Sequence, residues 1–118
     1  MAELIACLST GKGTWGHVGR IIQEEQWTKI LLITNEYGKE NFTKNEKTEF
    51  IVINANQGLK ELREEIYNKL KEKVTKTEVA INFISGSGKE HMALISAVLK
   101  LGVGIRLVAL TKDGMEEI

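Results

Sequence analysis

The chain has 118 residues, and its 16 basic and 16 acidic side chains cancel to a formal net charge of zero at pH 7. This balance argues against a protein whose whole surface binds nucleic acid, because domains of that kind are usually strongly basic. We therefore expect no general DNA binding. No apolar run approaches the ~20 residues of a membrane span, and no basic N-terminal region precedes a segment that resembles a signal peptide. We therefore expect a cytoplasmic protein without a membrane partner, folded as one domain over residues 1–118.

Short apolar runs alternate with stretches of helical periodicity, which is the pattern of βαβ units. The helix expected after the first strand begins near Gly16. The polar segment 35–49 gives only a weak signal for a short helix, whereas apolar side chains recur every three or four residues over 59–74 and predict the clearest helix. The predicted strands are residues 3–8, 29–34, 49–54, 79–84 and 104–110, the last one closed by a turn at 112–114.

The segment 90–101 is apolar on nearly all sides, so the helix predicted there needs cover on more than its sheet side. In so short a chain a second subunit is the natural cover, and we expect a homodimer through helix 90–101. Gly102 fits the C-terminal stop of this helix.

The strands are uniformly apolar, which implies a sheet covered on both faces. Right-handed crossovers then predict the strand order 3-2-1-4-5. The predicted fold class is α/β: a single Rossmann-like three-layer domain with a mainly parallel five-stranded sheet.

A glycine-rich loop follows the first predicted strand and reads Ser9-Thr10-Gly11-Lys12-Gly13-Thr14-Trp15-Gly16-His17. It contains G-x-G-x-x-G between a strand and a helix. Glycine allows a phosphate to approach the backbone closely, and the amides of a helix N-terminus attract anions. A dinucleotide would fit the same motif with Glu36 as its acidic partner, and a tight turn without a ligand remains the alternative. Trp15 would either stack on a base or cover the end of the helix.

A second loop, Ser85-Gly86-Ser87-Gly88-Lys89-Glu90-His91, follows the fourth predicted strand. The first and fourth strands are neighbours in the predicted order, so both loops should adjoin one crevice at the carboxyl edge of the sheet. Each loop offers hydroxyls, glycine amides, a lysine and a histidine, which favours an anionic ligand, most simply phosphate. The second loop is not a P-loop, because Phe83 stands where that motif needs glycine and Glu90 where a hydroxyl should hold magnesium.

The run Ser85-Gly86-Ser87-Gly88-Lys89, with Met92 after it, resembles a signature of CARF domains, the CRISPR-associated Rossmann-fold sensors. Their fourth strand commonly ends in a Thr-Gly-Gly-Thr-Lys-like loop. Ser85, Gly86 and Lys89 match that loop, whereas Ser87 and Gly88 depart from its Gly-Thr order. The run Ser9-Thr10-Gly11 resembles the other ligand loop of the family. The resemblance implies a homodimer with a cyclic oligoadenylate across its two-fold axis.

Sensors of this family usually carry an effector domain, for which 118 residues leave no room. The resemblance therefore implies either a module that only binds the messenger or a ring nuclease that cleaves it by 2′-hydroxyl attack, without metal or cofactor. For cleavage, Lys89 would stabilise the developing negative charge, His17 and His91 would transfer protons, and Ser9 would orient the sugar. The expected ligand-binding residues are Thr10, Gly11, Lys12, Gly13, Thr14, Trp15, Gly16, Ser85, Gly86, Ser87 and Gly88.

Other readings of the same residues are a small nucleotide-, dinucleotide- or nucleotide-sugar-binding module without catalysis, and a subunit whose apolar helix docks on a different protein. Both histidines could equally be solvated residues of a first helical turn. Cys7, the single cysteine, lies within the first apolar run, where we expect a small buried hydrophobe. One cysteine allows neither an internal disulfide nor a cysteine-based metal site.

Overall fold

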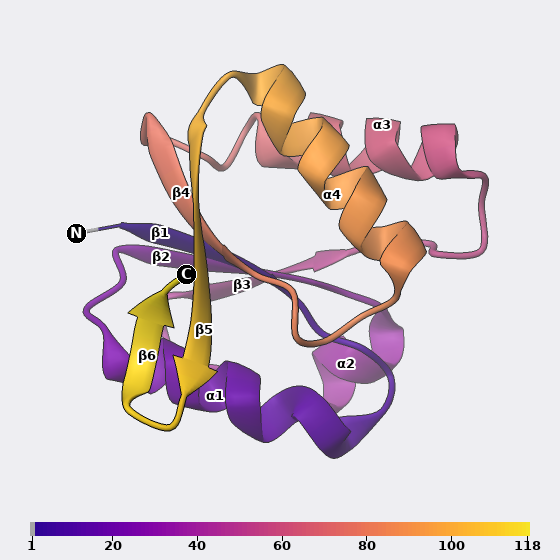
Figure 1. Cartoon of the computed structure of the whole chain (residues 1–118). Coiled ribbons are helices and arrows are strands. Elements are labelled where there is room, and N and C mark those ends of the chain that lie inside the picture. Colours follow the sequence, from indigo (N-terminus) through magenta and orange to yellow (C-terminus); the bar gives the residue numbers. More distant parts are fainter. Residues whose placement is uncertain (1) are drawn as a thin grey trace.

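The computed structural model describes residues 2–118 as one mixed sheet with helices on both faces. Helices α3 and α4 lie on one face, and α1 and α2 lie on the other (Figure 1). In chain order the elements are β1 (Glu3–Cys7), the 3₁₀ helix η1 (Lys12–Thr14), α1 (Trp15–Glu24), β2 (Lys29–Thr34), α2 (Glu36–Asn41), β3 (Thr48–Val52), α3 (Leu59–Leu70), β4 (Glu78–Asn82), α4 (Gly88–Leu101), β5 (Gly104–Thr111) and β6 (Gly114–Glu117).

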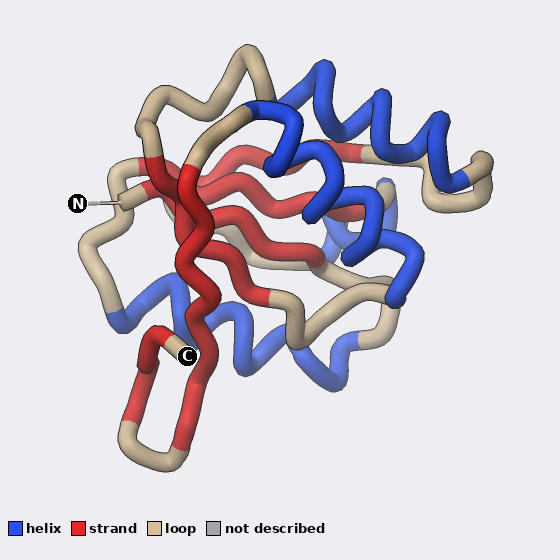
Figure 2. The backbone as a smooth tube through the Cα atoms, turned by 45° about the horizontal axis from the view of Figure 1, so that its top comes forward, coloured by secondary structure: helices blue, strands red, loops and turns tan. Residues whose placement is uncertain are grey.

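The sheet order is β3-β2-β1-β4-β5-β6, which confirms the order predicted for the first five strands. These five strands are parallel, and β6 pairs antiparallel with β5. The sixth strand was not predicted. The turn at 112–114 does not close the domain but forms a hairpin with Gly114 at φ 102°, and the hairpin extends past the sheet (Figure 2). Its sequence, Gly-Met-Glu-Glu, lacks the apolar alternation by which strands are recognised.

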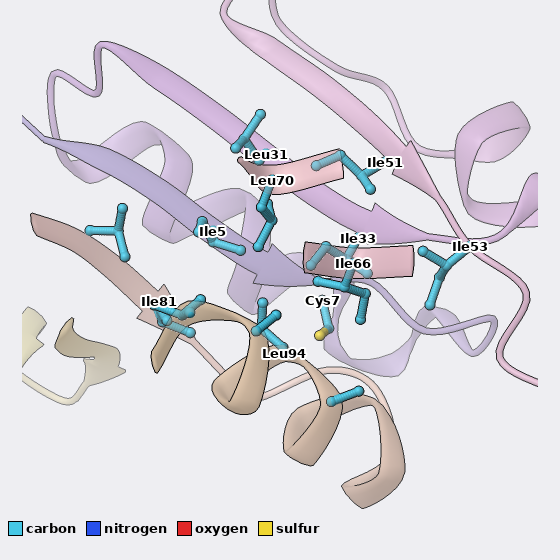
Figure 3. Packing of buried hydrophobic residues seen from close by; sticks show 14 of the residues in the cluster. Ile5, Cys7, Leu31, Ile33, Ile51, Ile53, Ile66, Leu70, Ile81 and Leu94 are labelled. Atoms are coloured by element: carbon cyan, nitrogen blue, oxygen red, sulfur yellow. The ribbon is translucent and has the colours of Figure 1, made fainter. Parts of the chain in front are cut away.

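Two apolar clusters fill the spaces between the sheet and its helices. Successive side chains of a strand point to opposite faces, so Ile5 and Cys7 of β1 belong to the cluster under α3 and α4, and Leu4 and Ala6 belong to the one over α1. Figure 3 shows Ile5 and Cys7 beside Leu94 of α4. This double burial is why the central strands read as continuous apolar runs.

Helix α4 begins at Gly88, two positions before the predicted start, because Ser87 and Glu90 form a capping box at its N-terminus. It ends at Gly102, whose φ of 77° is left-handed, as the sequence predicted. Helix α3 packs alongside α4 (Figure 2) and covers part of the apolar surface that we assigned to a second subunit. Met92 and Leu99 of α4 remain 58% and 66% exposed.

Two helices differ from the sequence prediction in extent. The weakly signalled segment after β2 forms the short helix α2, because the Asn35 side chain accepts a hydrogen bond from the Gly38 amide and caps its start. Helix α3 ends at Leu70, short of the predicted residue 74. Within residues 2–118, no helix has both the length and the apolar character that a membrane crossing would need.

Candidate functional site

The two glycine-rich loops meet at the carboxyl edge of the sheet. Strands β1 and β4 are paired neighbours, with Ala6 opposite Asn82 near their ends. Beyond them, the Ser9 amide donates a hydrogen bond to Ser85 Oγ at 2.7 Å, and Ser85 Oγ donates to Ser9 Oγ at 3.0 Å. Because Ser85 is only 1% exposed, these bonds are shielded from water and fix the two turns against each other.

Trp15, expected to contact the ligand, packs against the protein itself. Its indole Nε1 donates to the Ser9 carbonyl at 2.9 Å, and its ring meets Phe42 edge-on with centroids 5.6 Å apart. The ammonium group of Lys12 lies 5.7 Å from the same ring centroid. Trp15 therefore covers the start of α1, which was the second of the two roles considered for it, and its bond to the Ser9 carbonyl restrains the first loop.

The glycines of the first loop face open space. Gly11, Gly13 and Gly16 have no left-handed φ, and a Cβ added to any of them would meet no heavy atom of the described residues within 4 Å, chain neighbours aside. The fold itself therefore makes no steric demand for glycine at these positions. They leave the backbone of the loop accessible to a ligand, which is how glycine serves phosphate-binding turns.

The second loop is more tightly packed. Gly86 has a φ of 100°, and a Cβ there would lie 3.0 Å from Cys7 Cβ and 3.2 Å from Glu90 Oε1. Glu90 Oε1 also accepts a hydrogen bond from the Ser87 amide at 2.7 Å. A carboxylate thus occupies the electropositive start of α4, so the first loop is the more favourable place for a phosphate.

Lys89 reaches a third loop that the sequence did not point to. Its Nζ donates hydrogen bonds to the carbonyl of Ala55 at 2.9 Å and to the carbonyl of Gln57. These carbonyls belong to the segment that links β3 to α3. The lysine expected to stabilise a phosphate therefore ties α4 to that segment.

The two histidines have opposite hydrogen-bonding roles. His91 Nε2 lies 2.7 Å from the Ser85 carbonyl, so this nitrogen carries a proton and donates it. His17 Nε2 lies 3.2 Å from the Leu110 amide, which is a donor, so this nitrogen accepts and His17 is neutral. Burial lowers the pKa of His17 from its ordinary value of 6.5, in agreement with that role.

His17 and Asn82 complete the hydrogen bonding of β5. Pairing between β4 and β5 ends at Ile81 and Leu107, although β5 runs four residues further. Asn82 Nδ2 donates to the Val108 carbonyl at 2.9 Å, and His17 Nε2 accepts from the Leu110 amide. Two side chains thus replace the backbone of β4 where that strand has ended. Asn82, which is 3% exposed, was not singled out from the sequence.

Cys7 is buried, as expected, and burial with the nearby Glu90 carboxylate raises the pKa of its thiol to about 12.

The larger hollows of the surface lie away from the two loops. One of ≈ 420 Å³ opens beside Trp27 and Arg106 at the amino edge of the sheet, and one of ≈ 430 Å³ runs between α3 and α4 beside Met92.

No family model matches the chain, and no curated protein matches it significantly.

Proposed function

We propose that this protein binds a cyclic oligoadenylate at the joined β1–α1 and β4–α4 loops of a homodimer. The observation that carries the proposal is the contact between Ser9 and Ser85. It joins the two loops where the order of the parallel strands reverses direction, and open α/β sheets bind their ligands in the crevice at such a point.

The first loop supplies the phosphate site in this proposal. From Ser9 to Arg20 the chain has no acidic residue. Gly11 and Thr14 precede η1 and α1, and within the described chain neither makes a side-chain cap hydrogen bond. The Trp15 amide donates to the Lys12 carbonyl, but no side-chain cap occupies the start of either helix, which leaves room for an anion there. The start of α4 differs, because Ser87 and Glu90 already serve as caps.

The geometry favours binding over cleavage. His17 Nε2 and His91 Nε2 are both engaged in hydrogen bonds to the backbone, and Lys89 Nζ is held by two carbonyls. A residue that transfers a proton must reach the reacting group itself. Lys89 would first have to leave its two carbonyls, and each histidine would have to act through Nδ1 while its Nε2 stays bonded to the backbone. We therefore propose a binding module, with ring cleavage as the second role to be tested.

The homodimer part of the proposal rests on α4. Met92 and Leu99 lie about one and about three turns along this helix from its start and are 58% and 66% exposed. Large apolar side chains that are exposed on one helix face mark a surface suited to association. A two-fold axis beside this helix would bring two first loops towards the same ring of phosphates.

Calorimetric titration with cyclic tetra- and hexa-adenylate in EDTA tests this proposal. We expect binding by the wild type and weaker binding by Gly13→Ala, because the added methyl group blocks close approach to the loop. Gly19→Ala in α1 is the matched control, since a Cβ at Gly19 also meets open space, and it should bind like the wild type. Chromatography of the same mixtures detects linear products, which would identify a ring nuclease.

Absence of binding to either ring would refute the proposal. Binding of NADH with none of the cyclic oligoadenylates would instead support the dinucleotide alternative, with Glu36 at the start of α2 as the acid near the ribose.

A further inference from the structure

The hollow at the amino edge of the sheet lies at the opposite edge from the two glycine-rich loops. Its volume is ≈ 420 Å³, and it opens between residues 25–27, which follow α1, and the amino halves of β4 and β5. The buried apolar side chains of Trp27, Ala80 and Val108 line it. A hollow of this volume is within the range of small-molecule sites, which typically combine apolar walls with a few polar groups.

Arg106 brings a guanidinium group to this apolar lining. Successive side chains of a strand point to opposite faces, so Arg106 lies on the same face of β5 as Val108, a member of the core cluster over α1. Its Nε donates to Glu117 Oε1 at 3.0 Å, whereas its Nη1 is 3.9 Å from Glu78 Oε1, too far for a hydrogen bond. Within residues 2–118, neither terminal nitrogen of Arg106 has a hydrogen-bond partner, so the fork that binds carboxylates is available.

The charged side chains around the hollow carry both signs. Two are the carboxylates of Glu25 and Glu78, and two are the cations of Lys76 and Arg106. Because like charges repel at short range, a purely anionic ligand would be opposed by the carboxylates and a purely cationic ligand by the cations. A ligand that carries one charge of each sign, with an apolar body for the lining, matches all of these groups.

We infer that this hollow binds a free α-amino acid with a large apolar side chain. The ammonium and carboxylate groups of such a ligand are attached to the same carbon, and Glu78 Oε1 and Arg106 Nη1 are only 3.9 Å apart, so one molecule can bond to both. Its carboxylate accepts hydrogen bonds from the terminal nitrogens of Arg106, and its ammonium donates to Glu78. Its side chain packs on Trp27 and Val108. The hollow contains no residue of the glycine-rich loops, so this inference does not depend on the proposed function.

Calorimetric titration of the wild type with four probes tests the inference without any variant. The probes are phenylalanine, phenylalaninamide, which lacks the carboxylate, 3-phenylpropanoate, which lacks the ammonium, and glycine, which lacks the apolar side chain. We expect phenylalanine to bind about tenfold more tightly than each of the others, or better, because each omission leaves one group of the site without its partner.

Two variants then assign the contacts. Arg106→Met keeps an apolar stem without the guanidinium fork, and Glu78→Gln removes the negative charge. Each should weaken phenylalanine binding about tenfold or more. Arg106→Met should not weaken the binding of phenylalaninamide, and Glu78→Gln should not weaken that of 3-phenylpropanoate. Arg20→Met and Glu64→Gln are the matched controls, because both residues are charged but lie outside the hollow, and both should bind phenylalanine like the wild type.

Three results would each overturn the inference: no binding of phenylalanine, equally tight binding of any of the other three probes, or wild-type affinity for phenylalanine in Arg106→Met or Glu78→Gln. The same variants separate this site from the glycine-rich loops at the far edge of the sheet. Arg106→Met should bind cyclic tetra-adenylate as the wild type does, so failure of this inference and failure of the proposed function are distinct results.

Discussion

Ser85 Oγ lies 2.7 Å from the amide nitrogen of Ser9, although 76 positions separate the two residues in the chain. The hydroxyl of Ser85 also donates to Ser9 Oγ, and Ser9 Oγ donates onward to the Gly11 carbonyl at 3.0 Å. A buried side chain of the second loop thus determines how the first loop leaves β1. The conformation of the proposed phosphate site therefore depends on Ser85 as well as on Trp15, which donates to the Ser9 carbonyl.

Replacement of Ser85 by alanine should therefore lower both stability and ligand affinity. The Ser9 amide would lose its acceptor in a protected place, and an unsatisfied buried donor costs about 1–3 kcal/mol. Urea unfolding measures the change, with Ser96→Ala on α4 as the control, because Ser96 is only partly buried and alanine is favourable within a helix. Equal urea midpoints for the two variants would show that the contact between the loops is dispensable.

Gly86 and Gly88 provide a matched pair within one loop. Gly86 has a φ of 100°, and an added Cβ would press against Cys7 Cβ. A left-handed backbone costs a residue with a side chain about 1–2 kcal/mol, so Gly86→Ala should lower the free energy of unfolding by at least that amount. Gly88 opens α4 with free space around it, so Gly88→Ala should be neutral or stabilising. Similar urea midpoints for both variants would contradict the described geometry of the turn.

His17 should make stability depend on pH. Its pKa in the folded protein is lowered below the ordinary value of 6.5, so below about pH 6.5 the unfolded chain binds a proton that the folded chain does not. The stabilisation that comes from neutral His17 is thus present above this pH and is lost as the pH falls towards the folded pKa. His17→Gln retains an acceptor for the Leu110 amide but does not titrate.

Urea unfolding of wild type and His17→Gln across pH 5 to 8 measures this dependence. The stability of the wild type relative to the variant should decrease as the pH falls through this range. A constant difference would mean that His17 is protonated equally in the folded and unfolded states.

Cys7 should report unfolding of the sheet. Its thiol is 1% exposed, and its pKa is raised to about 12, so almost no thiolate forms near neutral pH. We expect a thiol reagent to label the native protein only at the rate at which the chain opens, and to label the urea-unfolded protein at once. Rapid labelling of the native protein near neutral pH would show that the first strand is less protected than its packing indicates.

The arrangement of the sheet could be predicted from the sequence because it follows from local pattern. Five apolar runs separated by helical segments, joined by right-handed crossovers, favour the order 3-2-1-4-5, and that order brought the loops of Ser9 and Ser85 together. The strand β6 could not be found in this way, since Met115 is the only apolar side chain among its four residues. It forms because β5 is long enough to offer a free edge.

The hydrogen-bond partners of the candidate residues could not be predicted. Lys89, His17 and His91 have the side-chain types expected of a phosphate or proton-transfer site, but their partners belong to other parts of the chain. Lys89 is held by the Ala55 carbonyl and His17 by the Leu110 amide, and no local pattern relates such distant backbone groups. Residue type predicts what a side chain can do, whereas the tertiary fold decides whether it is free to do it.

The exposed apolar side chains of α4 lead to the last prediction. Met92 and Leu99 remain uncovered after α3 has packed against the helix, so Leu99→Glu would place a charge within the proposed homodimer interface. A charge without a partner in an apolar interface is strongly unfavourable, and the variant should be monomeric and folded. Tyr37→Glu is the control, because Tyr37 is also exposed, at 41%, but lies on α2 on the opposite face of the sheet (Figure 1).

Light scattering gives the mass in solution. We expect twice the 13.2 kDa of one chain for the wild type and for Tyr37→Glu, and the mass of one chain for Leu99→Glu. Because the variant changes α4 and leaves both loops intact, its affinity for AMP should stay that of the wild type, whereas its affinity for cyclic tetra-adenylate should fall, since that ring needs two subunits. A monomeric wild type, or a dimer that survives Leu99→Glu, would remove α4 from the proposed interface.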